Sequence, residues 1–201
     1  SGASGDKLTA LVRLTLNGLP TIESFFVWGD SLKAHAKEIE ETLTYPFVAK
    51  DRYAQRGRGV FLIKNKTQFR KIVNNPNHKP LIFQKFVPSF QEYRLLVLGT
   101  NVGVFVKKVL TNKKEFRANI SLGASEEFMP LSTMPRKMAR IAVKASDTLG
   151  LQVGGVDIME DTEGRYWLLE VNRGPGITHD KSISPELTQM GQFFANELLF
   201  S

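Results

Sequence analysis

Residues 155–172, GVDIMEDTEGRYWLLEVN, decide the fold that the sequence predicts. The runs at 155–159 and 166–171 are rich in apolar and β-favouring side chains, and the segment DTEG at 161–164 is typical of a tight turn. Two such runs around such a turn predict an antiparallel hairpin. Because most of its side chains are apolar, we expect this hairpin to be buried in the core of the domain.

Three polar side chains interrupt the apolar pattern of the hairpin: Asp157, Glu170 and Asn172. Glu170 and Asn172 are two residues apart, so they share a face of their strand. If the hairpin closes on 161–164, Asp157 lies opposite or nearly opposite Glu170, with Cβ atoms about 5 Å apart. Two carboxylates that close in an apolar setting repel each other and resist ionisation, and a divalent cation removes this difficulty.

Carboxylate and amide oxygens are hard ligands that suit magnesium, with manganese as a second candidate. The sequence therefore predicts a magnesium site made of Asp157, Glu170 and Asn172. The alternative is an ordinary hairpin in which both carboxylates face solvent. The segment RGPG at 173–176 favours the metal site, because such a tight loop can bring backbone N–H groups and Arg173 near an anion.

Length and composition limit the class of protein. The chain has 201 residues, 42% of them hydrophobic, which suits one large domain or one domain with two lobes. It has no cysteine and only three scattered histidines, which excludes disulfides, cysteine nucleophiles and a credible zinc site. No apolar run approaches the roughly 20 residues that span a bilayer, and no export signal opens the chain, so we expect a cytoplasmic protein without a membrane partner. The net charge of +7 favours anionic partners such as nucleotide phosphates, an acidic peptide or nucleic acid.

The rest of the chain predicts helices and mostly antiparallel strands. Apolar spacing and capping residues predict helices at 7–17, 30–43, 66–73, 135–149 and 185–199. Besides the hairpin, strands are predicted at 25–28, 47–50, 60–63, 81–84, 92–98, 102–110 and 116–121.

The predicted fold class is α+β, with one domain of residues 6–201 in two lobes. We expect a small lobe at about 22–82 and a large lobe at about 83–201, with a helix at 6–18 on the large lobe. The segment SGASG at 1–5 is interpreted as a leader or a cloning scar outside the fold.

The segment QRGRG at 55–59 joins the strand that ends at Lys50 to the strand at 60–63. It has neither the spacing of a Walker phosphate loop nor a following helix, as a dinucleotide fingerprint requires. Three interpretations stay open: a flexible flap that covers phosphates, an Arg-Gly segment that binds RNA, and a plain hairpin turn.

Residues 83–88, FQKFVP, predict a strand that runs into a connection between the lobes. Backbone N–H and C=O groups in such a connection can pair with the edge of an adenine, with Phe86 or Val87 against the base. The alternative is a buried strand end without a ligand.

Taken together, these segments resemble the ATP-grasp ligases, in particular the RimK-like glutamate ligases and their amino-acid ligase relatives. The resemblance covers nearly the whole chain from Asp6. The segments that carry it are DK at 6–7, FVAK at 47–50, QRGRGV at 55–60, QKFV at 84–87, EYR at 92–94, FRAN at 116–119, GVD at 155–157 and EVN at 170–172.

The resemblance implies a two-lobed ATP-grasp fold with antiparallel sheets flanking the nucleotide. It implies a ligase that uses ATP and magnesium to join a carboxylate to an amine through an acylphosphate. The implied nucleotide-binding residues are Lys7 and Lys50 for the phosphates, Gly57 and Gly59 in the flap, Gln84, Lys85, Phe86 and Val87 for adenine, and Glu92 for ribose. The implied catalytic residues are Arg117, Asn119, Lys108 and Arg94, the metal ligands are Asp157, Glu170 and Asn172, and the acceptor site includes Arg173 and Gly174.

The sequence also departs from the family pattern. Lys85 stands where relatives usually have Glu, Asp51-Arg52 replaces the usual proline and small residue, and Arg173 replaces a common serine. These ligases usually carry a small amino-terminal α/β domain before the position of Asp6. We therefore expect either a shortened chain or a minimal form whose substrate site is completed by another component.

The expected function is an ATP-dependent carboxylate–amine ligase. Its expected substrates are amino-acid or peptide carboxylates and amines, and an acidic protein tail is one candidate acceptor. The first alternative is an ATP-binding module or ligase fragment without catalytic activity. The more distant alternative, an RNA-binding domain, leaves the polar residues of the hairpin unexplained, so nucleic acid is the least favoured partner.

Overall fold

The computed structural model describes residues 6–28, 31–53, 59–75, 80–110, 124–178, 180 and 182–200. They form two compact units. The small unit contains residues 6–8 and 22–88, and the large unit contains residues 9–21 and 89–201. Each unit is built on an antiparallel sheet with helices, which confirms the predicted α+β class. No helix in the described ranges is long and apolar enough to cross a membrane.

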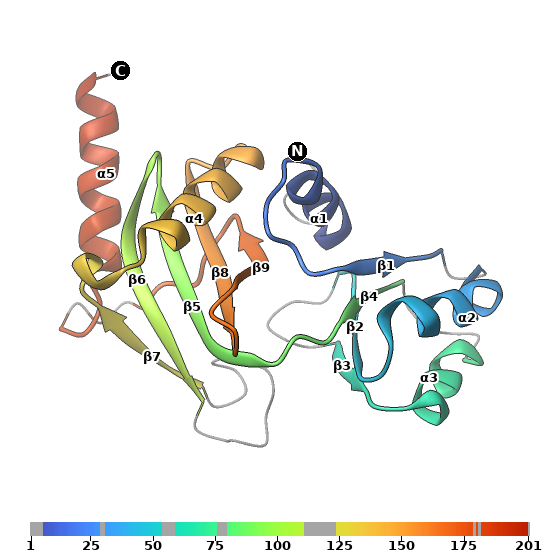
Figure 1. Ribbon diagram of the computed structural model, residues 1–201. Helices are drawn as coiled ribbons and strands as arrows, with labels where there is room; N and C mark the ends of the chain where they lie inside the picture. The colour runs from blue at the N-terminus through green and yellow to red at the C-terminus, as the bar shows by residue number, and fades with distance from the viewer. Residues whose placement is uncertain are drawn as a thin grey trace. The chain divides into compact units, whose positions relative to one another are not determined.

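The small unit has a four-stranded sheet in the order β1-β4-β2-β3. Its elements are β1 Ser24–Phe26, α2 Leu32–Leu43, β2 Phe47–Asp51, β3 Val60–Ile63, α3 Lys66–Val73 and β4 Leu81–Lys85. Asn65 begins α3 as its N-cap, because its side-chain oxygen accepts a hydrogen bond from Gln68 N at 3.0 Å. In Figure 1, α2 and α3 lie on the same side of this sheet.

The core of the small unit is aromatic. Phe47, Phe69 and Phe83 meet edge to face, with ring centroids 5.2–6.1 Å apart, and none of them is more than 1% exposed. On the opposite face of the sheet, the strand register places Phe26, Ile82 and Lys50 in one row across β1, β4 and β2. Lys50 therefore lies on this face, and the rings of Phe47 and Phe83 lie on the core face.

The large unit has a five-stranded antiparallel sheet in the order β7-β6-β5-β8-β9. Its strands are β5 Ser89–Leu98, β6 Asn101–Leu110, β7 Ala124–Met129, β8 Val153–Asp161 and β9 Tyr166–Asn172. Its helices are α4 Arg136–Thr148, α5 Glu186–Phe200 and the 3-10 turn Leu131–Thr133, together with most of α1 Lys7–Leu16.

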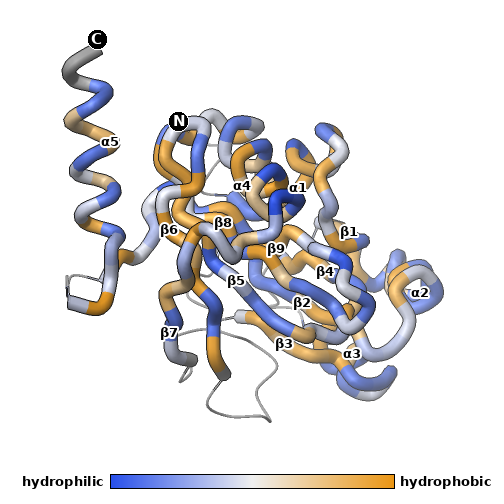
Figure 2. The backbone as a smooth tube through the Cα atoms, turned by 60° about the vertical axis from the view of Figure 1, so that its left-hand side comes forward, coloured by the Kyte–Doolittle hydropathy of each residue, from blue (hydrophilic) through white to orange (hydrophobic). Residues whose placement is uncertain are grey.

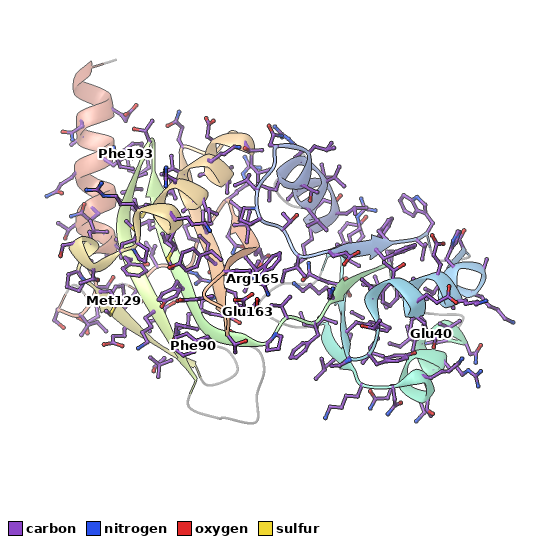
Figure 3. The ribbon with its side chains drawn as sticks, viewed as in Figure 1. Glu40, Phe90, Met129, Glu163, Arg165 and Phe193 are labelled. Atoms are coloured by element: carbon purple, nitrogen blue, oxygen red, sulfur yellow. The ribbon has the colours of Figure 1, made fainter. Side chains whose placement is uncertain are left out.

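The two faces of this sheet differ. One face is apolar and contacts α1 and α4, and Figure 1 shows α4 lying across its strands. This core includes Ala10, Leu14, Leu95, Val97, Met138, Ala142, Val156 and Ile158. Along β5 the colour changes from hydrophilic to hydrophobic, as Figure 2 shows, because its last four residues are LLVL. On the second face, the apolar end of the sheet is covered by α5, whose Phe193 points towards the strands (Figure 3).

Most predicted helices and strands begin and end within a few residues of the observed ones, and one observed strand was not predicted. The strand β7 was not predicted, because its sequence ASEEFM carries two glutamates that disfavour strands. Those glutamates stand opposite lysines, since Glu126 pairs with Lys108 and Glu127 with Lys107 in the register with β6. Opposite charges across the pair stabilise the strand. The strand predicted at 116–121 lies outside the described residues.

Candidate active site

Charged residues gather on the second face of the large sheet, beyond the end that α5 covers. In one row, Arg94 of β5 pairs with Asp157 of β8, and Asp157 pairs with Glu170 of β9. Two residues before Arg94, and so on the same face of β5, Glu92 pairs with Lys108 of β6. Because directly paired residues share a face, these five side chains lie on the same side of the sheet.

The predicted register of the hairpin is confirmed. Asp157 stands opposite Glu170, Gly155 stands opposite Asn172, and the register shifts directly after Asp157. The turn is held by Asp161, whose carboxylate accepts hydrogen bonds from Glu163 N, Arg165 N, Arg165 Nε and Trp167 Nε1. Glu163 and Arg165 lie beside each other at the turn in Figure 3 and form a 3.0 Å ion pair.

Asp157 is a buried carboxylate with two cationic partners. Arg94 donates from Nε and Nη2 at 2.9 and 3.1 Å, and Lys108 Nζ lies 3.1 Å from Oδ1. Burial raises the pKa of Asp157, but the charges of Lys108 and Arg94 outweigh it, so the pKa of this carboxyl lies below its ordinary value. The expectation that Asp157 resists ionisation unless a divalent cation neutralises it is therefore wrong: Arg94 and Lys108 supply the positive charge.

Arg94 connects Asp157 to a second acid, Glu126 of β7. Its Nη1 lies 3.6 Å from Glu126 Oε1, and the charge of Asp157 raises the pKa of Arg94. Burial raises the pKa of Glu126 and Arg94 opposes this, while Glu186 adds a further upward shift. Glu126 was not among the predicted site residues. Its pairing could have been inferred from the sequence, because two adjacent glutamates, Glu126 and Glu127, complement the charges of two adjacent lysines, Lys107 and Lys108.

The donors on this face fit a hard divalent cation. Asp157 and Glu170 offer carboxylate oxygens from paired positions, and Asn172, two residues further along β9, offers an amide oxygen. Both oxygens of Asp157 already accept hydrogen bonds from Arg94, and Glu170 has interactions of its own. The ranges that the structure describes hold no cluster of three or more acids, histidines or cysteines suited to a metal. This small protein donor set fits magnesium, which keeps several places for water and phosphate.

The loop after β9 is fixed close to the hairpin. A Cβ added to Gly155 would lie 2.6 Å from Cβ of Pro175, so glycine is needed where the loop crosses β8. Further along, the buried carboxylate of Glu186 accepts hydrogen bonds from Thr178 N at 2.6 Å and from Ser184 Oγ at 3.0 Å. Arg173 and Gly174 are exposed at the start of this loop.

The predicted phosphate residues belong to the small unit. Lys50 lies near the end of β2, and Lys7 is the first residue of α1. The preceding residue, Asp6, accepts a hydrogen bond from Leu8 N at 3.2 Å, which fits the predicted cap of α1. Gly59 has φ +70°, a conformation that favours glycine, directly before β3.

The predicted adenine residues lie at the end of β4 and in the segment that follows it. Gln84 is buried, and its side chain donates to Ser24 Oγ at 2.9 Å. Lys85 N donates to Glu23 O at 2.9 Å, so this N–H is already used. Phe86 and Val87 follow β4 outside any helix or strand and are half-buried.

Three predicted residues lie outside the described residues: Gly57, Arg117 and Asn119. The three interpretations of the glycine-bearing loop therefore stay predictions. Within the described chain, the structure brings Glu92, Arg94, Lys108, Asp157 and Glu170 together on one face of the large sheet.

Comparison with known proteins defines the class. Residues 4–189 match the RimK-like ATP-grasp domain, and the chain belongs to this family. The chain is 26% identical over 198 residues to beta-citrylglutamate synthase B of Homo sapiens, covering 96% of this chain and 50% of that protein. It is 30% identical over 179 residues to a probable alpha-L-glutamate ligase of Shewanella halifaxensis, covering 87% of this chain and 37% of that protein. The chain thus spans about half, or less, of the length of these curated relatives.

Solved structures share the fold. The ATP-grasp ligase PsnB complexed with a minimal precursor superposes with a TM-score of 0.73 at 18% identity, covering 96% of this chain and 61% of that chain. The D-alanine–D-alanine ligase of Bacillus anthracis gives a TM-score of 0.74 at 14% identity, covering 99% of this chain and 69% of that chain. The ATP-grasp fold implied by the sequence is therefore confirmed.

Proposed function

We propose that this chain is the ATP- and magnesium-binding domain of a ligase that joins a carboxylate to an amine. The observation that carries this proposal is the charged row Arg94–Asp157–Glu170, set in a RimK-like ATP-grasp domain. An ordinary solvated hairpin has no need for a 6%-exposed Asp157 bound by two cations.

The residues of the large sheet have distinct roles in this proposal. The magnesium ligands are Glu170, Asn172 and the remaining lone pair of Asp157 Oδ2, which among the described residues accepts one hydrogen bond, from Arg94. When bound, magnesium neutralises phosphate oxygens and so makes the terminal phosphorus a better electrophile. Arg94 and Lys108 hold Asp157 in its ionised form and fix its orientation, because they occupy both of its oxygens.

The nucleotide is held by residues that the family resemblance assigns. Lys7 and Lys50 neutralise phosphates, Glu92 binds ribose, and the backbone of Phe86 and Val87 binds adenine, since the N–H of Lys85 is already used. Gly57 keeps its expected role in the flap. Arg117 and Asn119 keep theirs at the transferred phosphoryl group.

The reaction joins two substrates in two steps. A carboxylate oxygen attacks the γ-phosphorus of ATP, ADP leaves, and an acylphosphate forms. The amine then attacks the acyl carbon, and phosphate leaves with formation of the amide and loss of a proton. No side chain of this domain needs to form a covalent bond, so its contribution is positioning and charge neutralisation.

We propose amino acids or short peptides as the carboxylate and amine, with an acidic protein tail as one candidate acceptor and the cytoplasm as the compartment. The glutamate-ligase names of the relatives and the net charge of +7 support this choice. Arg173 and Gly174, exposed at the start of the loop after β9, are the proposed acceptor contacts.

Phosphate release from ATP tests the ligase assignment. Purified protein is incubated with ATP, magnesium and a panel of amino acids and acidic peptides, and both phosphate and new amide products are measured. We expect phosphate release that depends on one amine and one carboxylate together. Nucleotide binding without phosphate release for any substrate pair would instead favour the ATP-binding module or ligase fragment.

A further inference from the structure

Arg52 of the small unit lies in an aromatic box. Its guanidinium carbon lies 5.5 Å from the ring centre of Phe26, 5.3 Å from that of Trp28 and 5.1 Å from that of Tyr53. Cations at such distances are attracted to aromatic rings. Trp28 and Tyr53 are themselves 65% and 60% exposed, so these rings cover Arg52 rather than fill the core.

The guanidinium is committed to one acceptor. Nε and Nη2 donate to Oδ1 and Oδ2 of Asp6, both at 2.6 Å, and the two side chains are only 12% and 15% exposed. The third nitrogen, Nη1, is buried and has no hydrogen-bond partner among the described residues. The rings of Phe26, Trp28 and Tyr53 surround the guanidinium and stabilise the orientation in which it forms the fork with Asp6.

This pair lies beside the proposed phosphate residues. Arg52 N donates to Pro80 O at 3.1 Å, which continues the pairing of β2 with β4, and residues two apart share a face. Arg52 therefore lies on the same face as Lys50, where Phe26 occupies the row of Lys50. The carboxylate that Arg52 holds belongs to Asp6, which caps α1 and directly precedes Lys7.

We propose that Arg52 is a positioning residue of the nucleotide site: through Asp6 it fixes the start of α1 and so places Lys7 for the nucleotide phosphates. The inference deepens the proposed function and rests on it, because Lys7 needs a nucleotide to contact. Arg52 itself touches no phosphate in this proposal. Two of its three nitrogens, Nε and Nη2, donate to Asp6, and the third, Nη1, is buried.

A purely structural ion pair would have a different effect. Loss of a structural pair lowers the stability of the small unit and leaves the affinity of the folded protein for nucleotide unchanged. Loss of a positioning pair weakens nucleotide binding by the folded protein, and only as far as Lys7 contributes to binding. The two roles are therefore separated by a thermodynamic cycle between Arg52 and Lys7.

The experiment measures binding of ADP with magnesium by calorimetry below the melting temperature of every variant. Arg52→Lys keeps the charge but removes the fork with Asp6, and Asp6→Asn removes the acceptor charge. Lys7→Ala and the double variant Arg52→Lys/Lys7→Ala complete the cycle. Arg70→Lys, the same change at an exposed arginine of α3, is the matched control.

We expect Arg52→Lys, Asp6→Asn and Lys7→Ala each to weaken ADP binding by roughly tenfold, the usual effect of one charged hydrogen bond. Adding Lys7→Ala to Arg52→Lys should weaken it by less than about twofold more. Without nucleotide, the Leu8 amide, which donates to Asp6, should exchange its hydrogen faster in Arg52→Lys than in Arg70→Lys.

The possible failures are distinguishable. If Lys7→Ala weakens binding and Arg52→Lys does not, or if their effects multiply, the positioning role is wrong and the proposed function stands. If the unmodified protein binds no ADP with magnesium, the proposed function is wrong and the positioning role is wrong with it.

Discussion

The sheets of the two units carry their charged residues in different ways. In the large sheet, the charged side chains sit within paired strands, so that Arg94, Asp157 and Glu170 form one row across β5, β8 and β9. In the small sheet, the paired strands are mainly apolar around the rings of Phe47, Phe69 and Phe83, and the ion pair of Arg52 lies just beyond the end of β2.

This difference determines which substitutions destabilise each sheet. A charge inside a paired row is fixed by the strand register and by its neighbours, so its removal leaves buried partners without compensation. A charge beyond a strand end is fixed only by the groups that surround it. We therefore expect the large sheet to depend on its ions for stability, and the small sheet to depend on its aromatic packing.

The largest expected effect is that of Asp157→Asn. This change leaves the buried Lys108 and the partly buried Arg94 without their shared carboxylate, and we expect a loss of roughly 3–5 kcal/mol in the free energy of unfolding. Urea unfolding at neutral pH measures it, with Asp147→Asn on the exposed side of α4 as the matched control. Equal stability of the two variants would show that the ion row does not stabilise the large sheet.

The sequence predicted this row in part. Strand periodicity and the turn at 161–164 place Asp157 opposite Glu170, because pairing follows directly from turn geometry. The role of Asp157 as the partner of Arg94 and Lys108 could not be predicted in this way, since it depends on how β5 and β6 join the hairpin. Glu126 was missed with its strand, and Glu186 and the box around Arg52 arise from contacts between residues that no local pattern relates.

In the small unit, we expect Phe69→Leu to lower stability through lost aromatic packing. The ring is 1% exposed and contacts both Phe47 and Phe83, so its replacement by a smaller side chain leaves a cavity. We expect a loss of roughly 1–2 kcal/mol that does not change with salt concentration. Phe61→Leu, at a ring that is 53% exposed, is the control and should change stability little. A strong salt dependence for Phe69→Leu would contradict the distinction between the two sheets.

The smallest expected effect concerns pH and Asp161. Burial raises the pKa of Asp161, but hydrogen bonds from Trp167 and Arg165 outweigh it and hold the pKa well below the ordinary value. A carboxyl with a lowered folded pKa stabilises the protein fully above its unfolded value of about 3.9, and this stabilisation is lost as the pH falls below it. We expect Asp161→Asn to melt a few degrees lower at pH 7, and to lose less stability than the unmodified protein between about pH 4 and pH 2. Parallel curves for the two proteins in that range would contradict the role of Asp161 in the turn.

We propose that the row containing Asp157 and Glu170 binds magnesium together with ATP. The most direct measurement is the affinity for ADP with and without magnesium, in the unmodified protein, in Glu170→Gln and in the control Glu163→Gln at the exposed turn of the same hairpin. We predict that magnesium strengthens ADP binding at least roughly tenfold in the unmodified protein and in Glu163→Gln, because one charged metal contact contributes about that much. Glu170→Gln should lose this dependence while remaining folded. The same magnesium dependence in all three proteins would show that Glu170 does not bind the metal.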